Sequence, residues 1–383
     1  SPQAIQERLG SAIADLKQVH RLDQYQIIFN QLEEISVDYI LKTLQNLGKN
    51  LPANETFSTQ ELSQELGIIE PQQKLFRRLL DILTEYWGEW SLFGTGERRL
   101  FGTGERPFAP TDPNPDIKIK ELLNTYPEAT TELTLLQKCG TNLGDVLQGN
   151  CDPLQLIFPD GDLTLATRLY QDSPPAKAMN QLLEKVIAVA ISNFPNEKTL
   201  NCLEIGAGTG GTTAYLLPTL NQRSLQYTFT DVSPLFLIQG KKKFRDYEFV
   251  SYQRLDIEQE VTAQHFPLHH YDIIIAANVL HATEDLSVTL QNIKQLLAPN
   301  GLLILLEGTQ PTRWLDLIFG LTSGWWRFND AWRDNYPLLS ATQWQTLLEN
   351  SGFTEVSVIT PTDEQAIIIS QNETFEVQPA TND

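Results

Sequence analysis

The sequence is poor in the features of secreted and membrane-spanning proteins. Only three of its 383 residues are cysteine, and no pair has metal-ligand spacing, so we expect reduced, buried thiols in a cytoplasmic protein. No apolar run approaches the roughly 20 residues of a membrane span. The N-terminus has no basic stretch followed by an apolar one, so we expect no secretory signal peptide. A start at Ser1 is what we expect of a domain cut from a longer polypeptide or of a trimmed tag.

Positive charge is also scarce. The chain has 28 Lys and Arg residues against 48 Asp and Glu residues, which gives a formal net charge of −20. A surface this acidic repels nucleic acid and anionic membranes, so we expect neither as a partner. The substrate is therefore expected to be small, or to be delivered by a partner through local contacts. The densest basic run, Lys241–Lys243 with Arg245, is typical of a solvated helix face.

Two regions with different patterns divide the chain. Residues 1–160 have mainly helical spacing of apolar residues, and we predict a helical lid or scaffold domain there. Ser58–Leu62 has the pattern of a capped helix start, and Lys74–Trp87 that of an apolar-striped helix. The pair resembles a helix-turn-helix, but the net charge disfavours DNA binding. The region ends near Pro159–Gly161, where a turn signal separates it from a catalytic core over residues 161–383.

A short doubled segment lies inside the first region. The heptapeptide LFGTGER occurs at residues 92–98 and again at 100–106. Two copies do not make a solenoid, and no helix signal follows that would support a phosphate loop. We expect a hairpin-like excursion there, followed by a linker over residues 110–115.

From about residue 180 short strands alternate with helices. The predicted strands are 200–205, 227–231, 249–255, 272–277, 302–306, 355–359 and 366–370, and the predicted helices are 213–220, 235–244, 286–297 and 340–351. This alternation predicts an α/β fold with a mostly parallel sheet covered on both faces. The last two strands are joined too tightly for a crossover helix, so the final strand should run antiparallel.

The strongest local motif is Leu203–Gly211, which ends a strand and opens a helix. Glycines at Gly206, Gly208 and Gly210 let the backbone turn sharply and approach a ligand closely. The spacing of Gly206, Gly208 and Gly211 also fits a dinucleotide fingerprint. The motif alone therefore indicates a nucleotide-like ligand and no more.

Further features at the strand ends narrow the class of nucleotide-like ligand that the glycine motif could bind. Asp231 ends the next strand, where a carboxylate can accept both hydroxyls of a ribose. Asp256 ends the third strand and is expected to bind an adenine amino group, with Ile257 packing on the ring. Leu296–Ile304 then gives a helix end, a Pro-Asn-Gly turn and a strand.

In these motifs the chain resembles the class I methyltransferases. The resemblance implies a Rossmann-like core with a seven-stranded sheet and S-adenosylmethionine as cofactor. That cofactor has no pyrophosphate, so the glycine loop needs no basic group. Its ammonium is expected to meet Glu204 and nearby carbonyls, although Glu204 is equally well interpreted as a structural acceptor.

Catalytic candidates follow the next two strands. Asn278 opens the stretch Asn278–Thr283 and is expected to contribute to the cofactor site, while His281 lies within it. Ligands of doubly wound sheets bind at the carboxyl ends of the strands. Glu307 ends the next strand, and because neighbouring strands lie about 4.8 Å apart, its side chain can meet His281. A carboxylate beside a histidine fixes its tautomer and raises its basicity, which predicts a general base.

A closer resemblance extends over about residues 165–372. The segments that carry it are LYQDSPP at 169–175, NVLHAT at 278–283, LLEGT at 305–309, LIFGLTSGWW at 317–326 and RDNYPLLS at 333–340. They are similar to the C-methyltransferase domains of modular polyketide synthases. This resemblance implies that His281 and Glu307 act together as the general base and that Tyr170 helps close the substrate pocket. It further implies methylation of the α-carbon of a β-ketoacyl chain on a phosphopantetheine-bound acyl carrier protein, beside neighbouring synthase domains.

The aromatic-rich insertion from Trp314 to Phe328 is expected to wall an apolar tunnel for that chain. Arg327, Arg333 or the Lys241 cluster is expected to meet the acidic carrier or its phosphate.

His265, His269 and His270 form an HxxxHH pattern, but Pro267 breaks any helix there, so we predict no metal site.

Three other functions stay open at this point. A small-molecule O-methyltransferase can also use a histidine base beside a helical N-terminal domain. A nicotinamide oxidoreductase shares the glycine motif and Asp231 but not, as a rule, the later motifs. An inactive methyltransferase-like spacer of a synthase is disfavoured by the intact glycine loop with His281 and Glu307.

Overall fold

The computed structural model describes residues 1–50, 56–87, 97–99, 114–192, 194–195, 197–221 and 224–374. Contacts among them divide the chain into two compact units. The core unit contains residues 1–22, 170–311 and 327–383, and the helical unit contains residues 23–169 and 312–326. Each unit is described separately below.

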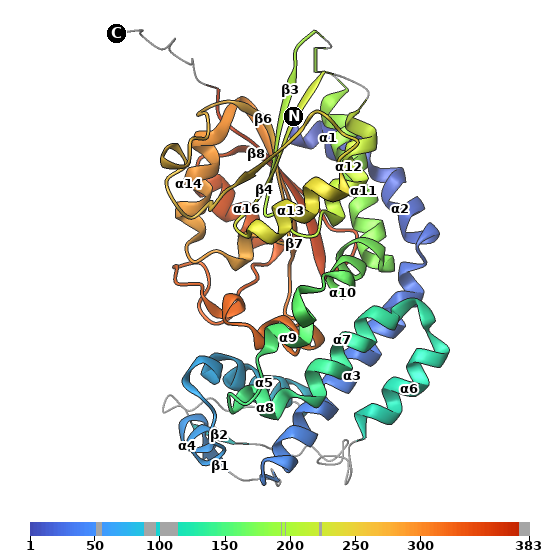
Figure 1. The fold of residues 1–383 in the computed structure, drawn as a ribbon, viewed down its shortest axis with the longest axis vertical. Helices are drawn as coiled ribbons and strands as arrows, with labels where there is room; N and C mark the ends of the chain where they lie inside the picture. Colours follow the sequence, from blue (N-terminus) through green and yellow to red (C-terminus); the bar gives the residue numbers. More distant parts are fainter. Residues whose placement is uncertain are drawn as a thin grey trace. The chain divides into compact units, whose positions relative to one another are not determined.

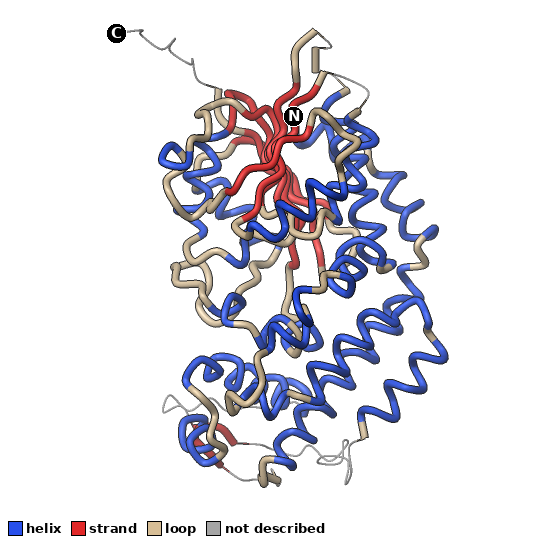
Figure 2. Tube along the Cα trace, viewed as in Figure 1, coloured by secondary structure: helices blue, strands red, loops and turns tan. Residues whose placement is uncertain are grey.

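A seven-stranded sheet forms the centre of the core unit, in the order β5-β4-β3-β6-β7-β9-β8. Figure 2 shows these strands gathered into one twisted sheet. All neighbours from β5 to β7 pair in parallel, whereas β9 pairs antiparallel with both β7 and β8. The strands are β3 (Leu200–Ile205), β4 (Leu225–Asp231), β5 (Val250–Arg254), β6 (Tyr271–Ala277), β7 (Leu297–Gly308), β8 (Thr354–Ile359) and β9 (Gln365–Gln371). The predicted Rossmann-like fold, with its antiparallel last strand, is confirmed.

Apolar side chains on both faces of this sheet explain why helices cover both sides (Figure 1). On one face the core includes Leu183 and Leu217, and on the other Leu290 and Trp344. The first face is covered by α1 (Pro2–Arg8), α2 (Gly10–Val19), α11 (Pro174–Ile191), α12 (Gly211–Leu220) and α13 (Pro234–Lys243). The second is covered by α14 (Leu286–Leu296) and α16 (Ala341–Asn350).

The predicted Pro-Asn-Gly turn is counted within β7, where the pairing with β6 shifts between Tyr271 and Ile273. Asn300 has φ of 61° there, so the chain does turn at this point.

The helical unit consists mainly of α3 (Leu22–Asn46), α4 (Thr59–Glu65), α5 (Gln73–Trp87), α6 (Pro115–Thr125), α7 (Thr130–Thr141), α8 (Leu143–Leu147), α9 (Pro153–Ile157), α10 (Thr164–Thr167) and α15 (Arg313–Asp316). The predicted cap is present, because the side chain of Ser58 accepts a hydrogen bond from the amide of Glu61. A short antiparallel pair joins β1 (Thr56–Ser58) to β2 (Glu97–Arg99).

The two units differ from the predicted division at residue 160 in three places. The first 22 residues belong to the core unit, where Gln6 donates to the carbonyl of Val358 and His20 bonds Gln181. Residues 312–326 belong to the helical unit, where Asp316 pairs with Arg78. The chain passes from the helical unit to the core unit between Leu169 and Tyr170.

Some sequence features lie outside the described residues. The doubled LFGTGER segment is described only at residues 97–99, and the predicted linker only at its last two residues, which open α6. Cys139, Cys151 and Cys202 are free thiols, of which Cys151 is only partly buried. No helix within the described ranges is both long and apolar enough to span a bilayer.

Candidate active site

A glycine loop joins β3 to α12 and contains three left-handed residues. Gly206, Gly208 and Gly210 have φ values of 61°, 54° and 68°. A Cβ on Gly206 would lie 2.7 Å from the methyl groups of Val279, and one on Gly210 would lie 2.6 Å from the ring of Phe244. A Cβ on Gly208 would meet nothing closer than 3.8 Å. Two glycines therefore let side chains pack beneath the loop, while a Cβ on Gly208 would make only an ordinary contact with the carbonyl of Gly206, which leaves a side that a ligand can approach.

Asp231 is joined to this loop at the end of β4. Its Oδ2 accepts a hydrogen bond from the amide of Gly208 at 3.0 Å, and its Oδ1 accepts one from the amide of Ser233 at 2.9 Å. Burial raises the pKa of Asp231. Each carboxylate oxygen can accept a second hydrogen bond, so capacity remains for two ribose hydroxyls. The open face at Gly208 and this carboxylate fit the nucleoside part of S-adenosylmethionine.

Glu204 lies on β3 just before the loop and is buried. Its Oε2 accepts hydrogen bonds from the hydroxyls of Thr213 at 2.6 Å and Tyr227 at 2.5 Å. Burial raises the pKa of Glu204 to about 7. These bonds favour the structural interpretation of Glu204, and a contact with the cofactor ammonium stays a prediction.

Asp256 and Ile257 follow β5. The Oδ1 of Asp256 accepts from the amide of Glu258 at 3.1 Å, which fixes the turn beyond the strand. Ile257 is 4% exposed, and its carbonyl accepts from Asn292. Their predicted contacts with adenine are compatible with this placement and stay predictions.

The structure brings His281 and Glu307 together at the ends of β6 and β7. His281 lies in the short turn Leu280–Ala282, and its Nδ1 is 2.7 Å from Oε2 of Glu307. Oε1 of Glu307 accepts from the amides of Val279 and Leu280 at 3.1 and 2.8 Å. A single buried carboxylate therefore orients both the imidazole and the backbone that carries it.

Asn278 makes the bend before this turn. It has φ of 55°, and its amide donates to the carbonyl of Leu306 at 2.6 Å. Asparagine tolerates the left-handed conformation better than most residues. Its backbone thus has a clear role in shaping the turn, while the expected contact of its side chain with the cofactor stays a prediction.

Tyr170 lies in the π-helical turn Arg168–Asp172, a rare conformation that is frequent at functional sites. Its carbonyl accepts from Nδ2 of Asn180 at 2.9 Å and would lie 3.0 Å from a Cβ on Gly211. Burial, and then the charge of Glu307, raise the pKa of the Tyr170 hydroxyl far above its usual value. Tyr170 is therefore a protonated hydrogen-bond donor in the electrostatic range of the His281–Glu307 pair.

Arg333 is a functional candidate whose position sequence reasoning missed. It is 3% exposed, and its guanidinium donates to the carbonyls of His281 and Thr283, each at 2.8 Å, and of Glu284 at 3.1 Å. Asp330 pairs with it at 2.5 Å. This burial contradicts the expected contact of Arg333 with a carrier protein. Arg333 instead holds the turn that bears His281.

The other basic residues that are expected to contact the carrier have different surroundings. Arg327 pairs with Glu258 at 2.9 Å and lies 3.9 Å from Glu284, so acidic neighbours already offset its charge. Lys241 and Lys242 are exposed, as predicted for a solvated helix face. Lys243 is exposed as well, but its ammonium is directed to the glycine loop.

The aromatic insertion is divided between the two units. Its first part packs in the helical unit, where Gln72 donates to the carbonyl of Leu321 and Lys74 to that of Trp326. The remaining residues, from Arg327, belong to the core unit. A role in walling an acyl chain stays a prediction.

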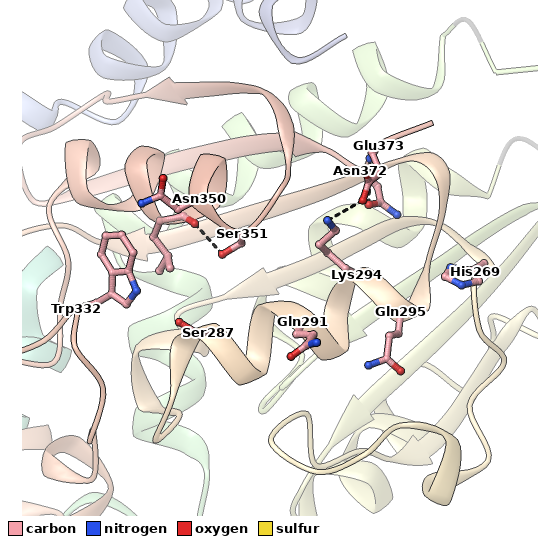
Figure 3. Close-up of a pocket in the computed structure, with 11 residues that line it drawn as sticks. His269, Ser287, Gln291, Lys294, Gln295, Trp332, Asn350, Ser351, Asn372 and Glu373 are labelled. Atoms are coloured by element: carbon pink, nitrogen blue, oxygen red, sulfur yellow. Dashed lines mark hydrogen bonds and ion pairs between the residues drawn. The ribbon is translucent and has the colours of Figure 1, made fainter. Parts of the chain in front are cut away.

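A groove of about 590 Å³ lies between α14 and α16 and contains none of the predicted site residues. Lys294 and Glu373 form an ion pair within it (Figure 3). His269 is at its edge and bonds the carbonyl of Leu297. Within the described residues, no group of three or more His, Cys, Asp or Glu side chains has the placement to hold a metal ion.

Comparisons with known proteins agree with this geometry. Residues 203–303 match the family model described as a methyltransferase domain. The chain is 33% identical over 330 residues to the non-reducing polyketide synthase prhL of Penicillium brasilianum, and 39% identical over 240 residues to the reducing polyketide synthase ppsB of Aspergillus oryzae. These matches cover 85% and 61% of this chain but only 13% and 10% of the synthases.

Solved structures of single domains match along nearly the whole chain. The CurJ carbon methyltransferase is 42% identical with a TM-score of 0.90, covering 98% of this chain and 100% of that one. The DszA carbon methyltransferase is 32% identical with a TM-score of 0.85, covering 97% of each chain. The CMeT domain of the citrinin polyketide synthase is 27% identical with a TM-score of 0.84, again over 97% of each.

Proposed function

Because the chain belongs to the carbon methyltransferase domains of polyketide synthases and uses S-adenosylmethionine, we propose that it methylates the α-carbon of a β-ketoacyl chain carried by an acyl carrier protein. The match with this chain spans only 13% of the length of the curated synthase prhL. The carrier and the neighbouring synthase domains are therefore part of the proposal.

The observation that carries the proposal is the buried Glu307 against Nδ1 of His281. An ionised carboxylate only accepts hydrogen bonds, so Nδ1 holds the proton and the lone pair is on the unprotonated Nε2. A lone pair fixed in this way suits a general base. An imidazole can remove a proton from a carbon between a ketone and a thioester, whereas the α-carbon of a reduced acyl chain is too weakly acidic.

The residues around the base support the same assignment. His281 Nε2 takes the α-proton, and the substrate is left as an enolate with a nucleophilic carbon. Tyr170, as a protonated donor in the electrostatic range of Glu307, would bind an oxygen of the acyl chain. Asp231 and the glycine loop would hold the nucleoside of the cofactor. S-adenosylmethionine, when bound, supplies an electrophilic methyl group.

The test offers one carrier protein loaded in parallel with β-keto, β-hydroxy and fully reduced acyl chains, each with S-adenosylmethionine. We expect a mass gain of one methyl group on the β-keto form alone, located on the α-carbon by fragmentation or NMR. The His281→Asn variant should bind the cofactor but give no product.

Two other outcomes would contradict the proposal. A methyl group on oxygen, or equal turnover of the reduced chain, would support the O-methyltransferase alternative. Cofactor binding without turnover of any carrier would support an inactive spacer domain.

A further inference from the structure

Lys243 ends α13 and is bonded quite differently from the lysines before it. Its ammonium donates to Oε1 of Gln171 at 2.6 Å, to the carbonyl of Thr209 at 3.1 Å and to the carbonyl of Gly210 at 3.2 Å. An ammonium has three donors, so these acceptors use all of them. Burial lowers the pKa of Lys243, opposed by the charges of Asp172 and Glu204. This lysine is an anchored group, although it belongs to the basic run.

The three acceptors belong to two different parts of the site. Thr209 and Gly210 are in the glycine loop, whereas Gln171 directly follows Tyr170 in the π-helical turn. The turn has a second attachment to α12, because the hydroxyl of Tyr215 donates to the carbonyl of Gln171 at 3.1 Å. Lys243 thus bridges the expected cofactor loop and the segment that positions Tyr170.

Aromatic packing fixes the position of this bridge. The ammonium lies 5.3 Å from the ring centroid of Phe244, within the range of a cation–π contact. The same ring packs beneath Gly210. A change in the backbone of the glycine loop would therefore alter the surroundings of the ammonium directly.

We propose that Lys243 is a positioning residue that couples occupancy of the glycine loop to the placement of Tyr170. The inference rests on the proposed function only in taking Tyr170 as part of the substrate site. A ligand that orders the carbonyls of Thr209 and Gly210 also fixes the ammonium, and through Gln171 it fixes the π-helical turn. Because linkage is reciprocal, loss of the bridge must weaken both the ordering of the turn and the binding of the ligand.

The test compares three variants of the full chain by hydrogen–deuterium exchange and calorimetry, with S-adenosylhomocysteine as the ligand. Lys243→Met removes the ammonium and keeps a long apolar stem. Gln171→Met removes only the link to the π-helical turn. Lys242→Met is the matched control, because Lys242 is a neighbour on the same helix and is exposed like Lys243.

In the parent protein we expect the ligand to slow exchange both in residues 206–212 and in residues 168–172. Gln171→Met should keep the protection of the loop but lose most of the ligand-induced protection of 168–172, and by reciprocity it should weaken ligand binding, although by less than Lys243→Met does. Lys243→Met should lose the ligand-induced protection of both segments. It should bind the ligand about tenfold more weakly, which corresponds to one charge-assisted hydrogen bond of about 1.4 kcal/mol. Lys242→Met should match the parent, and Lys243→Arg should recover part of the protection.

Equal ligand-induced protection of residues 168–172 in Lys243→Met and Lys242→Met would overturn the inference. No acyl substrate is present in these measurements. If the proposal of a carrier-bound substrate is wrong, the results of the exchange and calorimetry measurements are unaffected. The two proposals can therefore fail separately.

Discussion

Glu307 contacts His281 through Nδ1, at 2.7 Å, and this contact determines which imidazole nitrogen is available as a base. The carboxylate is fully buried, and its other oxygen is occupied by two backbone amides. It therefore cannot rotate away without leaving those amides unpaired. The tautomer with an unprotonated Nε2 is set by the fold itself, before any ligand binds.

Glu307→Gln should remove activity almost as completely as His281→Ala. The glutamine oxygen can still accept from the amides of Val279 and Leu280, so its NH₂ faces Nδ1 of His281 and donates to it. Nε2 then holds the proton and no longer accepts one. We expect kcat to fall by about 10²–10⁴ for each variant, with little change in cofactor Kd. The double variant should lose no more than either single one, and losses that multiply would show independent roles.

Arg333→Lys should separate the positioning of His281 from the chemistry. A lysine keeps the charge near Asp330 but lacks the planar fork that reaches three carbonyls. We expect a clear fall in kcat with cofactor Kd unchanged. Arg333→Met removes the ion partner of Asp330, whose carboxylate keeps its hydrogen bonds from backbone amides, and should cost up to about 3–5 kcal/mol of stability. Arg327→Met, at a half-exposed ion pair, is the control and should change stability by less than about 1 kcal/mol. Unchanged kcat in Arg333→Lys would contradict this role.

Local sequence pattern was sufficient to predict the core. Buried apolar runs such as Leu200–Ile205 have the length of strands, and the observed β3 has these bounds. The meeting of His281 and Glu307 also followed from topology, because His281 follows β6 and Glu307 lies at the end of β7, and these neighbouring strands are parallel.

Contacts of long side chains between distant segments were not predictable in this way. Lys243 lies 72 positions from Gln171, and Arg333 lies 52 positions from His281. Nothing in the periodicity of a helix distinguishes a lysine in water from one directed to a loop. The same is true of α1 and α2, because an apolar stripe predicts burial but not the partner on which the helix packs.

Replacing two glycines of the loop by alanine should give opposite results. Gly208→Ala adds a methyl group without a clash, so it should cost only the left-handed strain of about 1–2 kcal/mol but weaken S-adenosylhomocysteine binding at least tenfold. Gly210→Ala places its Cβ 2.6 Å from the ring of Phe244 and should lower Tm much more. Adding Phe244→Leu should restore part of that loss. Thermal unfolding and calorimetry measure both effects, and normal binding by Gly208→Ala would show that the ligand does not approach there.

Glu204→Gln should change how the stability of the core unit depends on pH. Burial raises the pKa of Glu204 from 4.5 to about 7, so the folded protein binds a proton that the unfolded chain has released between these values. The contribution of Glu204 to the free energy of unfolding is fully present below pH 4.5 and is lost as pH rises through about 7. Glutamine still accepts from the hydroxyls of Thr213 and Tyr227 but does not ionise.

The free energy of unfolding of the parent should therefore fall relative to Glu204→Gln by about 2–3 kcal/mol between pH 5 and 8. Glu33 in the helical unit, whose pKa burial also raises to about 7, titrates in the same range. Its contribution is common to both proteins and cancels in the difference between them. Urea unfolding at pH 5, 6, 7 and 8 gives that difference directly. Parallel curves would mean that Glu204 is already ionised in the folded state, which would favour its predicted contact with the cofactor ammonium.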